Sequence, residues 1–289
     1  METMEGFESL VVRRADGVVF ATLNRPATRN ALGTEMLDEL NRVFSMIEDD
    51  ASVRALALRG ASGMFCAGGN IGGFREILQA EDAGQDPIAA RNRKFGAFME
   101  RFVALPVPVL AVVEGAAMGG GMGLACAADI VLATEDARFS LSETTLGVIA
   151  AQIAPAVAAR LGAAATRRLG LSGERISGAP ALRIGLVDDL APDGAALDAL
   201  QADWLSRIGR CAPNANRAFK LLTRRCGQEP NAGLLDDAAR MFARCLRDEG
   251  GEGTLAFREK RAPAWRVQFD AASVRAAHGV PPSSSAHLA

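Results

Sequence analysis

The chain has 289 residues, 49% of them hydrophobic, and its 32 basic and 34 acidic residues give a net charge of -2. This length allows one large domain or two smaller ones with a sizeable core. The basic residues are scattered among acidic ones, which argues against a nucleic-acid partner. The acidic stretch METMEGFESL lacks the apolar segment of a signal peptide, and the longest apolar run is too short to cross a bilayer. We therefore expect a cytoplasmic protein that binds neither nucleic acid nor membranes.

The cysteines and histidines restrict the chemistry further. Five cysteines, an odd number, show no Cys-x-x-Cys spacing, so neither a metal site nor a disulfide framework is expected. The histidines are His278 and His287, and both lie in a C-terminal segment whose composition predicts a mobile tail. Without a core histidine, Ser-His-Asp and Cys-His mechanisms are excluded, which leaves carboxylates, backbone dipoles and lysine. Cys66 is expected to be a buried structural thiol.

Taken in chain order, short strands alternate with helices over residues 1–192. The expected strands are residues 7–14, 18–23, 55–59, 107–113, 130–133 and 137–141. The expected helices are residues 34–47, 88–105, 122–128 and 153–161. Asp16 and Gly17 are expected to turn a hairpin, and Thr34 to cap the first helix. Repeated strand-strand-helix units of this kind predict stacked α/β layers.

From residue 193 onward the apolar periodicity is helical. Three amphipathic segments follow one another, DALQADWLSRIGR, PNANRAFKLLTRRC and LLDDAARMFARCL. We therefore expect an α/β core over residues 1–192, a helical subdomain over 193–267 and a mobile tail over 268–289.

Three consecutive glycines at residues 119–121 connect an apolar strand to a helix of small residues. A helix start presents N–H groups without intrahelical partners, and glycine lets a ligand approach them without a Cβ in the way. A phosphate-binding Walker loop would need Lys and Ser or Thr where Met122 and Gly123 stand. A Rossmann fingerprint fails at Leu124, in the place of its third glycine. The turn fits a smaller developing anion, such as an enolate oxygen, with close helix packing as the alternative.

A second backbone donor is expected in the loop FCAGGN at residues 65–70, which also leads from a strand into a helix start. With this loop the chain resembles the enoyl-CoA hydratase/isomerase family, also called crotonases, over most of residues 7–265. The motifs that carry the resemblance are LNRPATRNAL (23–32), FCAGGNI (65–71), EGAAMGGGMGLACAADI (114–130), FSLSETTLGV (139–148) and AFREKRAPAW (256–265). The resemblance implies a crotonase-like α/β spiral with C-terminal helices that mediate oligomerisation.

The resemblance also implies an acyl-CoA thioester substrate, with coenzyme A as part of that substrate and no other cofactor. It makes the N–H groups of Gly69 and Gly120 donors to the thioester oxygen, and Glu143 the acid/base residue. The residues implied to contact substrate are Ala67, Gly68, Asn70, Ile71, Gln152, Arg29 and Lys260. Family members usually form trimers or pairs of trimers, so Lys260 is expected to reach the coenzyme A of a neighbouring subunit.

The chain departs from the best-known hydratases at Gly123, where they carry a second glutamate. Gln152 lies in AAQIA, which replaces the family's PGAGG, and its amide is expected to orient water or to cap the following helix. Three functions stay open: a hydratase in which Gly123 leaves room for a bulky acyl chain, an isomerase that needs no water, and an acyl-CoA-binding scaffold. Similar single-glutamate sequences containing AQIAP point to branched, terpenoid-derived substrates of the isohexenylglutaconyl-CoA class.

Overall fold

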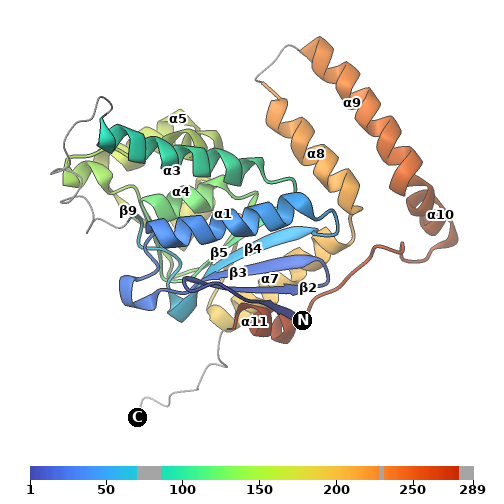
Figure 1. The fold of residues 1–289 in the computed structure, drawn as a ribbon, viewed down its shortest axis with the longest axis horizontal. Helices are drawn as coiled ribbons and strands as arrows, with labels where there is room; N and C mark the ends of the chain where they lie inside the picture. The colour runs from blue at the N-terminus through green and yellow to red at the C-terminus, as the bar shows by residue number, and fades with distance from the viewer. Residues whose placement is uncertain (70–85, 228–230, 280–289) are drawn as a thin grey trace.

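Strands and helices alternate along the chain, and the α/β class predicted from that alternation is confirmed. The computed structural model describes residues 1–69, 86–227 and 231–279, whose arrangement is drawn in Figure 1. Within them, seven strands form one sheet in the order β1-β2-β3-β4-β5-β7-β10. Three more form a small sheet in the order β6-β8-β9.

The element bounds show where sequence patterns were sufficient and where they were not. The strands are β1 (Glu2–Met4), β2 (Leu10–Ala15), β3 (Val18–Leu23), β4 (Ala55–Gly60), β5 (Val109–Val113), β6 (Ala116–Met118), β7 (Ile130–Thr134), β8 (Arg138–Ser140), β9 (Arg175–Ser177) and β10 (Asp189–Ala191). The helices are α1 (Thr34–Asp49), α3 (Pro87–Ala104), α4 (Gly120–Ala127), α5 (Ala154–Ser172), α6 (Gly178–Arg183), α7 (Gly194–Gly209), α8 (Pro213–Arg225), α9 (Asn231–Cys245), α10 (Gly251–Glu259) and α11 (Ala271–His278). Shorter helical turns are η1 (Pro26–Thr28), η2 (Ala61–Gly63), η4 (Glu143–Leu146) and η5 (Leu246–Gly250). Strands β1, β6, β9 and β10 were not predicted, because three residues are too few to show an apolar period.

The large sheet begins with the predicted hairpin. Strands β2 and β3 are antiparallel, and Asp16 and Gly17 between them have φ values of 50° and 79°, as a two-residue turn requires. From β3 onward the strands β4, β5, β7 and β10 run parallel, with helices as crossovers. The N-cap of α1 is Gly33 rather than the expected Thr34, because the chain is still extended at Gly33 and turns helical at Thr34.

Helices cover both faces of the large sheet, as Figure 1 shows. On one face Leu56 and Leu58 of β4 belong to the core formed with α1, α3, α4 and α5. On the other face Ala55 and Ala57 pack in a second core with α7 and α11. Strands that are buried on both faces read as continuous apolar runs, which is why β4 and β5 were predicted correctly.

Helices α8 and α9, the turn η5 and helix α10 form an arm that projects from this body (Figure 1). Two buried or half-buried cations of α8 fix its base. Lys220 Nζ lies 2.6 Å from Asp129 Oδ2 and donates to the carbonyl oxygen of Val107 at 2.8 Å. Arg217 Nη2 donates to the carbonyl oxygen of Val53 at 2.7 Å. The helical subdomain was predicted to begin at residue 193, but α7 packs on the sheet, so the projecting part begins only with α8.

The predicted mobile tail over 268–289 is wrong for residues 271–278, which form α11 against the sheet. His278 ends this helix and is 1% exposed. Its ring nitrogens lie 2.9 Å from Thr22 Oγ1 and 2.9 Å from Gln201 Nε2. Burial, together with the neighbouring arginines, lowers the pKa of His278 well below its usual range, so the ring is a neutral core group. This helix was not predicted, because the tail was judged by its overall composition and not by the apolar face that Val274 and Ala277 form.

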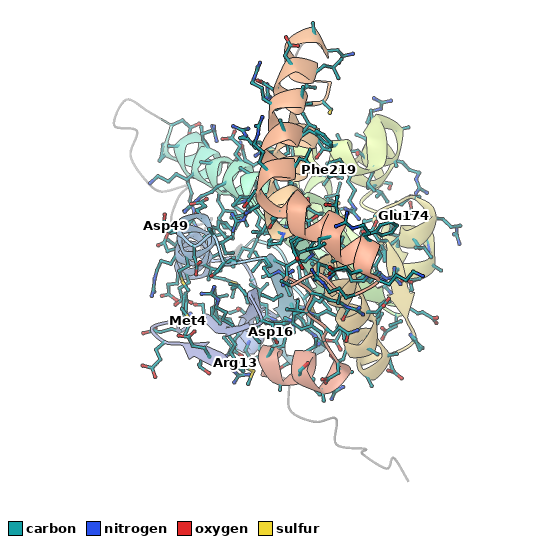
Figure 2. The ribbon with its side chains drawn as sticks, turned by 90° about the vertical axis from the view of Figure 1, so that its right-hand side faces the viewer. Met4, Arg13, Asp16, Asp49, Glu174 and Phe219 are labelled. Atoms are coloured by element: carbon teal, nitrogen blue, oxygen red, sulfur yellow. The ribbon has the colours of Figure 1, made fainter. Side chains whose placement is uncertain are left out.

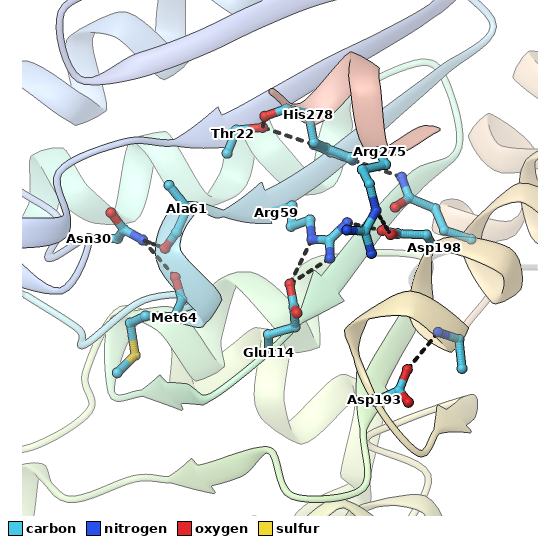
Figure 3. Close-up of polar contacts among 12 residues, drawn as sticks. Thr22, Asn30, Arg59, Ala61, Met64, Glu114, Asp193, Asp198, Arg275 and His278 are labelled. Carbon is cyan, nitrogen blue, oxygen red and sulfur yellow. Dashed lines mark hydrogen bonds and ion pairs between the residues drawn. The ribbon is translucent and has the colours of Figure 1, made fainter. Parts of the chain in front are cut away.

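A buried ion network joins α11 and α7 to the sheet (Figure 3). Arg59 on β4 is 1% exposed, and its guanidinium lies 2.6 Å from Glu114 Oε2 and 2.5 Å from Asp198 Oδ1. Arg275 Nε binds the second oxygen of Asp198 at 2.7 Å. Each buried charge in the network therefore has a hydrogen-bonded opposite charge, which is what burial of an ion requires.

Candidate active site

Three chain segments run side by side in parallel and end at the same edge. Strand β6 pairs with β8, so that Met118 lies opposite Ser140. On the other side of β6, Cys66 donates from its N–H to the carbonyl oxygen of Ala116 at 2.9 Å and accepts from the N–H of Met118 at 3.0 Å. Because parallel strands share the direction of their carboxyl ends, the loop after Cys66, the glycine turn and the segment after β8 meet there.

In the loop after Cys66, the hydrogen bonds among the described residues leave the N–H of Gly69 free. Ala67 donates from its N–H to the carbonyl oxygen of Arg29 at 3.0 Å. The N–H of Gly68 lies 3.4 Å from the Sγ atom of Cys66. Within the described part of the chain, no group accepts from the N–H of Gly69. The loop therefore presents the donor that the sequence predicted.

The glycine turn leaves a second free donor. Gly119 has φ 49° and ψ -116°, a conformation that side chains disfavour, and donates from its N–H to the carbonyl oxygen of Ser140 at 2.9 Å. Gly120 is the first residue of α4, and its N–H has no acceptor among the described residues. A Cβ on Gly121 would lie 2.6 Å from the carbonyl oxygen of Cys66, so this glycine serves close packing. The close-packing interpretation of the triple glycine thus applies at Gly121, while the role of Gly120 as an anion donor stays a prediction.

The two free N–H groups lie close to each other. An ideal Cβ on Gly120 would be 3.7 Å from the nitrogen of Gly69, and one on Gly68 would be 3.6 Å from the nitrogen of Gly120. The φ of Gly68 is 98°, which again requires glycine. Two free backbone N–H groups this close together are the elements from which an oxyanion hole is built.

Glu143 lies beside these donors. It begins η4, three residues after the end of β8, and a Cβ on Gly119 would be 2.8 Å from its Oε1 atom. Its Oε2 atom is buried and has no hydrogen-bond partner. Burial raises the pKa of this carboxyl group above its ordinary value. A carboxyl group with an unused oxygen and a raised pKa is suited to accept and return a proton.

A pocket of about 150 Å³ opens at Glu143. Its lining residues are Leu141, Glu143, Thr144, Ala150, Arg167, Gly170 and Leu171. The walls are mainly apolar, and Arg167 of α5 supplies the cation. In the described part of the chain Arg167 forms no ion pair, whereas the adjacent Arg168 lies 3.5 Å from Glu174. Arg167 was not predicted, because a helical arginine on the surface has no sequence signature of its own.

The space at Gly123 is occupied by protein. A Cβ on Gly123 would lie 2.7 Å from the Cβ of Ile153, which is 2% exposed and precedes α5. The expectation that Gly123 leaves room for a bulky acyl chain is therefore wrong, because Ile153 fills that room. The absence of a second carboxylate at this position is not compensated by empty space.

Gln152 does not cap the following helix. Its Nε2 atom donates to Asn92 Oδ1 at 2.7 Å, and its carboxamide lies against Gly96 of α3, where a Cβ would be 2.9 Å from its Cδ atom. The N-cap of α5 is Ile153, without a side-chain hydrogen bond. Gln152 is thus anchored to α3, and its role in orienting water stays a prediction.

The other residues expected to contact coenzyme A differ in how close they lie to the free N–H groups. The N–H of Ala67 donates to Arg29 and that of Gly68 lies against the Sγ atom of Cys66, so neither N–H is free for the predicted contacts with coenzyme A. Arg29 is exposed, with φ 53°, next to the first loop. Lys260 follows α10 in the arm, which lies away from α4 in Figure 1, so one chain does not bring it to Gly120. Asn70 and Ile71 lie outside the described residues.

The predicted structural role of Cys66 agrees with its environment. The thiol is buried, and burial raises its pKa to about 12, so it is no nucleophile at neutral pH. Over residues 1–69, 86–227 and 231–279, no cluster of three His, Cys, Asp or Glu side chains forms a metal site. None of the helices in these ranges is long and apolar enough to cross a bilayer.

Known proteins share this fold. The family model for enoyl-CoA hydratase/isomerase matches residues 13–268. Pseudomonas aeruginosa AtuE is 46% identical and superposes with a TM-score of 0.86 over 90% of this chain and all of that one. An enoyl-CoA hydratase/isomerase from Marinobacter aquaeolei is 43% identical, with a TM-score of 0.85 over 89% and 98% of the two chains. The 2,3-dehydroadipyl-CoA hydratase of Escherichia coli K12 is 32% identical over 89% of this chain and 98% of its own length. The chain therefore belongs to the enoyl-CoA hydratase/isomerase family.

Proposed function

We propose that the protein is an enoyl-CoA hydratase that uses Glu143 alone as acid and base. The observation that carries this proposal is the buried, unpartnered Oε2 atom of Glu143 beside the free N–H groups of Gly69 and Gly120. Relatives that align over most of their length are named as hydratases, among them the dehydroadipyl-CoA enzyme. For the cellular location we keep the expectation from the sequence, which is the cytoplasm.

The proposed reaction needs no group beyond substrate, water and these residues. The water oxygen bonds to C3 of the enoyl chain while the Glu143 carboxylate takes the water proton. The C2–C3 π electrons move into an enolate, whose oxygen accepts from the N–H groups of Gly69 and Gly120. Glu143 then returns the proton to C2, which restores its carboxylate and completes a 3-hydroxyacyl-CoA. The raised pKa of Glu143 suits both transfers.

We assign the substrate to the branched glutaconyl-CoA class, whose acyl chain ends in a carboxylate. The mainly apolar pocket at Glu143 suits the branch, and Arg167 suits the carboxylate. The dehydroadipyl-CoA named for the Escherichia coli relative also carries a second carboxylate. The volume of about 150 Å³ corresponds to a few methylene-sized groups, so a long branch would extend into solvent or along exposed Leu171.

Purified protein incubated with crotonyl-CoA, a branched glutaconyl-CoA and a 3-enoyl-CoA tests this assignment. The expected result is hydration of the glutaconyl ester, which is measured as the loss of the enoyl absorbance. Arg167→Met is expected to raise KM for that ester about tenfold, because a charged hydrogen bond is lost, and to leave crotonyl-CoA unaffected. Arg168→Met is the matched control, since Arg168 pairs with Glu174 outside the pocket. Equal KM values for wild type and Arg167→Met would refute the carboxylate contact.

An enoyl-CoA isomerase is the second candidate, favoured by Gly123. Moving a proton between C2 and C4 needs one carboxyl group and no water, and Ile153 closes the position at which a second acid would stand. Conversion of the 3-enoyl ester alone would support this reaction over hydration. Binding of all three esters without turnover would instead support an acyl-CoA-binding scaffold.

We further propose that the arm assembles three chains into a trimer or a pair of trimers. Large apolar side chains that are 49–87% exposed follow the arm: Phe219, Leu221, Leu235, Phe242, Leu246 and Phe257. Figure 2 shows Phe219 where the arm rises above the body. Several large exposed apolar side chains on one projecting segment are typical of an interface.

Light scattering is expected to give the mass of three or six chains. The double variant Phe242→Glu/Phe257→Glu should dissociate to single chains, since the charges would be buried in the interface. Ile88→Glu on α3, outside the arm, should leave the mass unchanged. A wild-type chain that is monomeric at micromolar concentration would contradict the assembly, and with it the contact of Lys260 to a neighbour.

A further inference from the structure

Asn30 is a buried polar residue that the proposed function has not yet used. It lies between β3 and α1, is fully buried and has φ 57°, a left-handed conformation that asparagine tolerates better than most residues. Its neighbour Arg29 is exposed and also left-handed. Burial of a carboxamide in such a conformation indicates that its hydrogen bonds hold the backbone in place.

The carboxamide of Asn30 connects two loops (Figure 3). Its Oδ1 atom accepts from the N–H of Arg25 at 2.8 Å within its own loop. Its Nδ2 atom donates to the carbonyl oxygens of Met64 at 2.6 Å and Ala61 at 3.2 Å. Those two residues stand between the end of β4 and the loop that carries Gly69. Both amide protons and the carbonyl oxygen are therefore engaged, and the loop of Asn30 is fixed against the start of the oxyanion loop.

The residues on either side of Asn30 hold the peptide group that presents the oxyanion donor. Leu32 donates from its N–H to the carbonyl oxygen of Gly68 at 2.7 Å. That carbonyl and the N–H of Gly69 belong to one planar trans peptide unit, so they point in opposite directions. Fixing the Gly68 oxygen toward Leu32 therefore directs the Gly69 N–H away from Leu32. The carbonyl oxygen of Arg29 accepts from the N–H of Ala67, which fixes the Cys66–Ala67 peptide at the start of the same loop.

We infer that Asn30 is a positioning residue of the oxyanion hole. By anchoring its loop to Met64 and Ala61, it sets the orientation of the Gly68–Gly69 peptide and so the aim of the Gly69 N–H at the thioester oxygen. This inference rests on the proposed function. A donor that is tilted or displaced stabilises the developing oxyanion less, while coenzyme A contacts elsewhere are untouched.

Two variants of Asn30 test the inference. Asn30→Gly keeps the left-handed backbone and removes the carboxamide, and Asn30→Asp keeps the shape but replaces the donor to Met64 and Ala61 by a carboxylate. Both variants are expected to lower kcat about 10- to 100-fold, where kcat is calculated from the concentration of sites that bind ester. The affinity for coenzyme A should change little. Thr28→Ala is the matched control, because Thr28 is exposed in the same loop and its hydroxyl, among the residues that the structure describes, donates only to the carbonyl oxygen of Arg25.

A bound chromophoric ester separates positioning from mere stability. A cinnamoyl-CoA whose carbonyl is polarised by both donors absorbs at longer wavelength, so wild type and Thr28→Ala should show the full red shift and the Asn30 variants a reduced one. Variants that melt earlier but keep the full shift and the wild-type kcat per bound ester would overturn the inference. A wild type that shows neither turnover nor a red shift would overturn the proposed function itself, and the inference with it.

Discussion

Replacing Glu143 with Gln is expected to lower kcat about 10²- to 10⁴-fold, the range by which a positioned acid/base group accelerates proton transfer. The amide keeps the size of the side chain beside Gly119 but can neither take a proton from water nor return one to C2. Binding of the acyl-CoA should persist, because Gly69 and Gly120 still donate. Steady-state kinetics with the ester that the wild type hydrates, together with calorimetric binding, measure both quantities.

The pH dependence gives this prediction a second readout. Burial raises the pKa of Glu143, so the acid limb of kcat/KM should lie above the ordinary glutamate range and vanish in Glu143→Gln. A carboxyl group with a raised folded pKa contributes stability that is complete below its unfolded pKa and is lost as pH rises through the folded value. At neutral pH the Gln variant should therefore melt no earlier than wild type.

Glu174→Gln is the matched control for this change. Glu174 is exposed at the end of α5 and pairs with Arg168 at 3.5 Å, outside the pocket. Its replacement should leave kcat and the acid limb as in wild type. A Glu143→Gln variant with more than about a tenth of wild-type kcat would exclude the catalytic role, since acid/base groups contribute at least about 10²-fold.

The largest expected loss of stability comes from Arg59→Met. Arg59 is the buried centre of the ion network, and its removal leaves the carboxylates of Glu114 and Asp198 without their shared guanidinium. Breaking a buried pair by removing one partner costs about 3–5 kcal/mol. Unfolding in urea, followed by circular dichroism, should show this decrease in the free energy of unfolding.

A surface pair provides the comparison for Arg59. Arg14→Met removes an ion pair of 2.7 Å with Asp50, both side chains being partly exposed, and should cost about 0–1 kcal/mol. The double variant Arg59→Met/Glu114→Gln should recover part of the loss, because Asp198 keeps its pair with Arg275 and no carboxylate of the network is left without a cation. An Arg59→Met variant no less stable than Arg14→Met would show that the network does not hold α7 to the sheet.

The parts of the fold that sequence predicted are those in which local pattern and tertiary role coincide. Strand β3 and the hairpin turn at Asp16 and Gly17 were predicted because an apolar run begins directly after two residues that tolerate positive φ. Among the described residues, the N–H of Gly120 is free for a similar local reason, since a glycine turn before a helix leaves N–H groups without intrahelical acceptors. Its role as an oxyanion donor stays a prediction.

What sequence did not predict depends on contacts between distant segments. His278 belongs to the core because Thr22 and Gln201, far away in the chain, supply its partners. Ile153 closes the space at Gly123 although no local pattern pairs them. The family resemblance pointed to Arg29, whereas its neighbour Asn30 makes the buried contacts, and those depend on Ala61 and Met64, which are more than 30 residues away.

The contact between Gly123 and Ile153 has a consequence for how such an active site can change over generations. Introducing a glutamate at residue 123 alone would force its Cβ against the Ile153 side chain, so the first step would damage packing before any second acid could help. Shrinking Ile153 first would open a cavity in the core, at a cost of about 2–5 kcal/mol. Each substitution is therefore unfavourable by itself, so a glutamate at residue 123 requires a smaller residue at 153 in the same step.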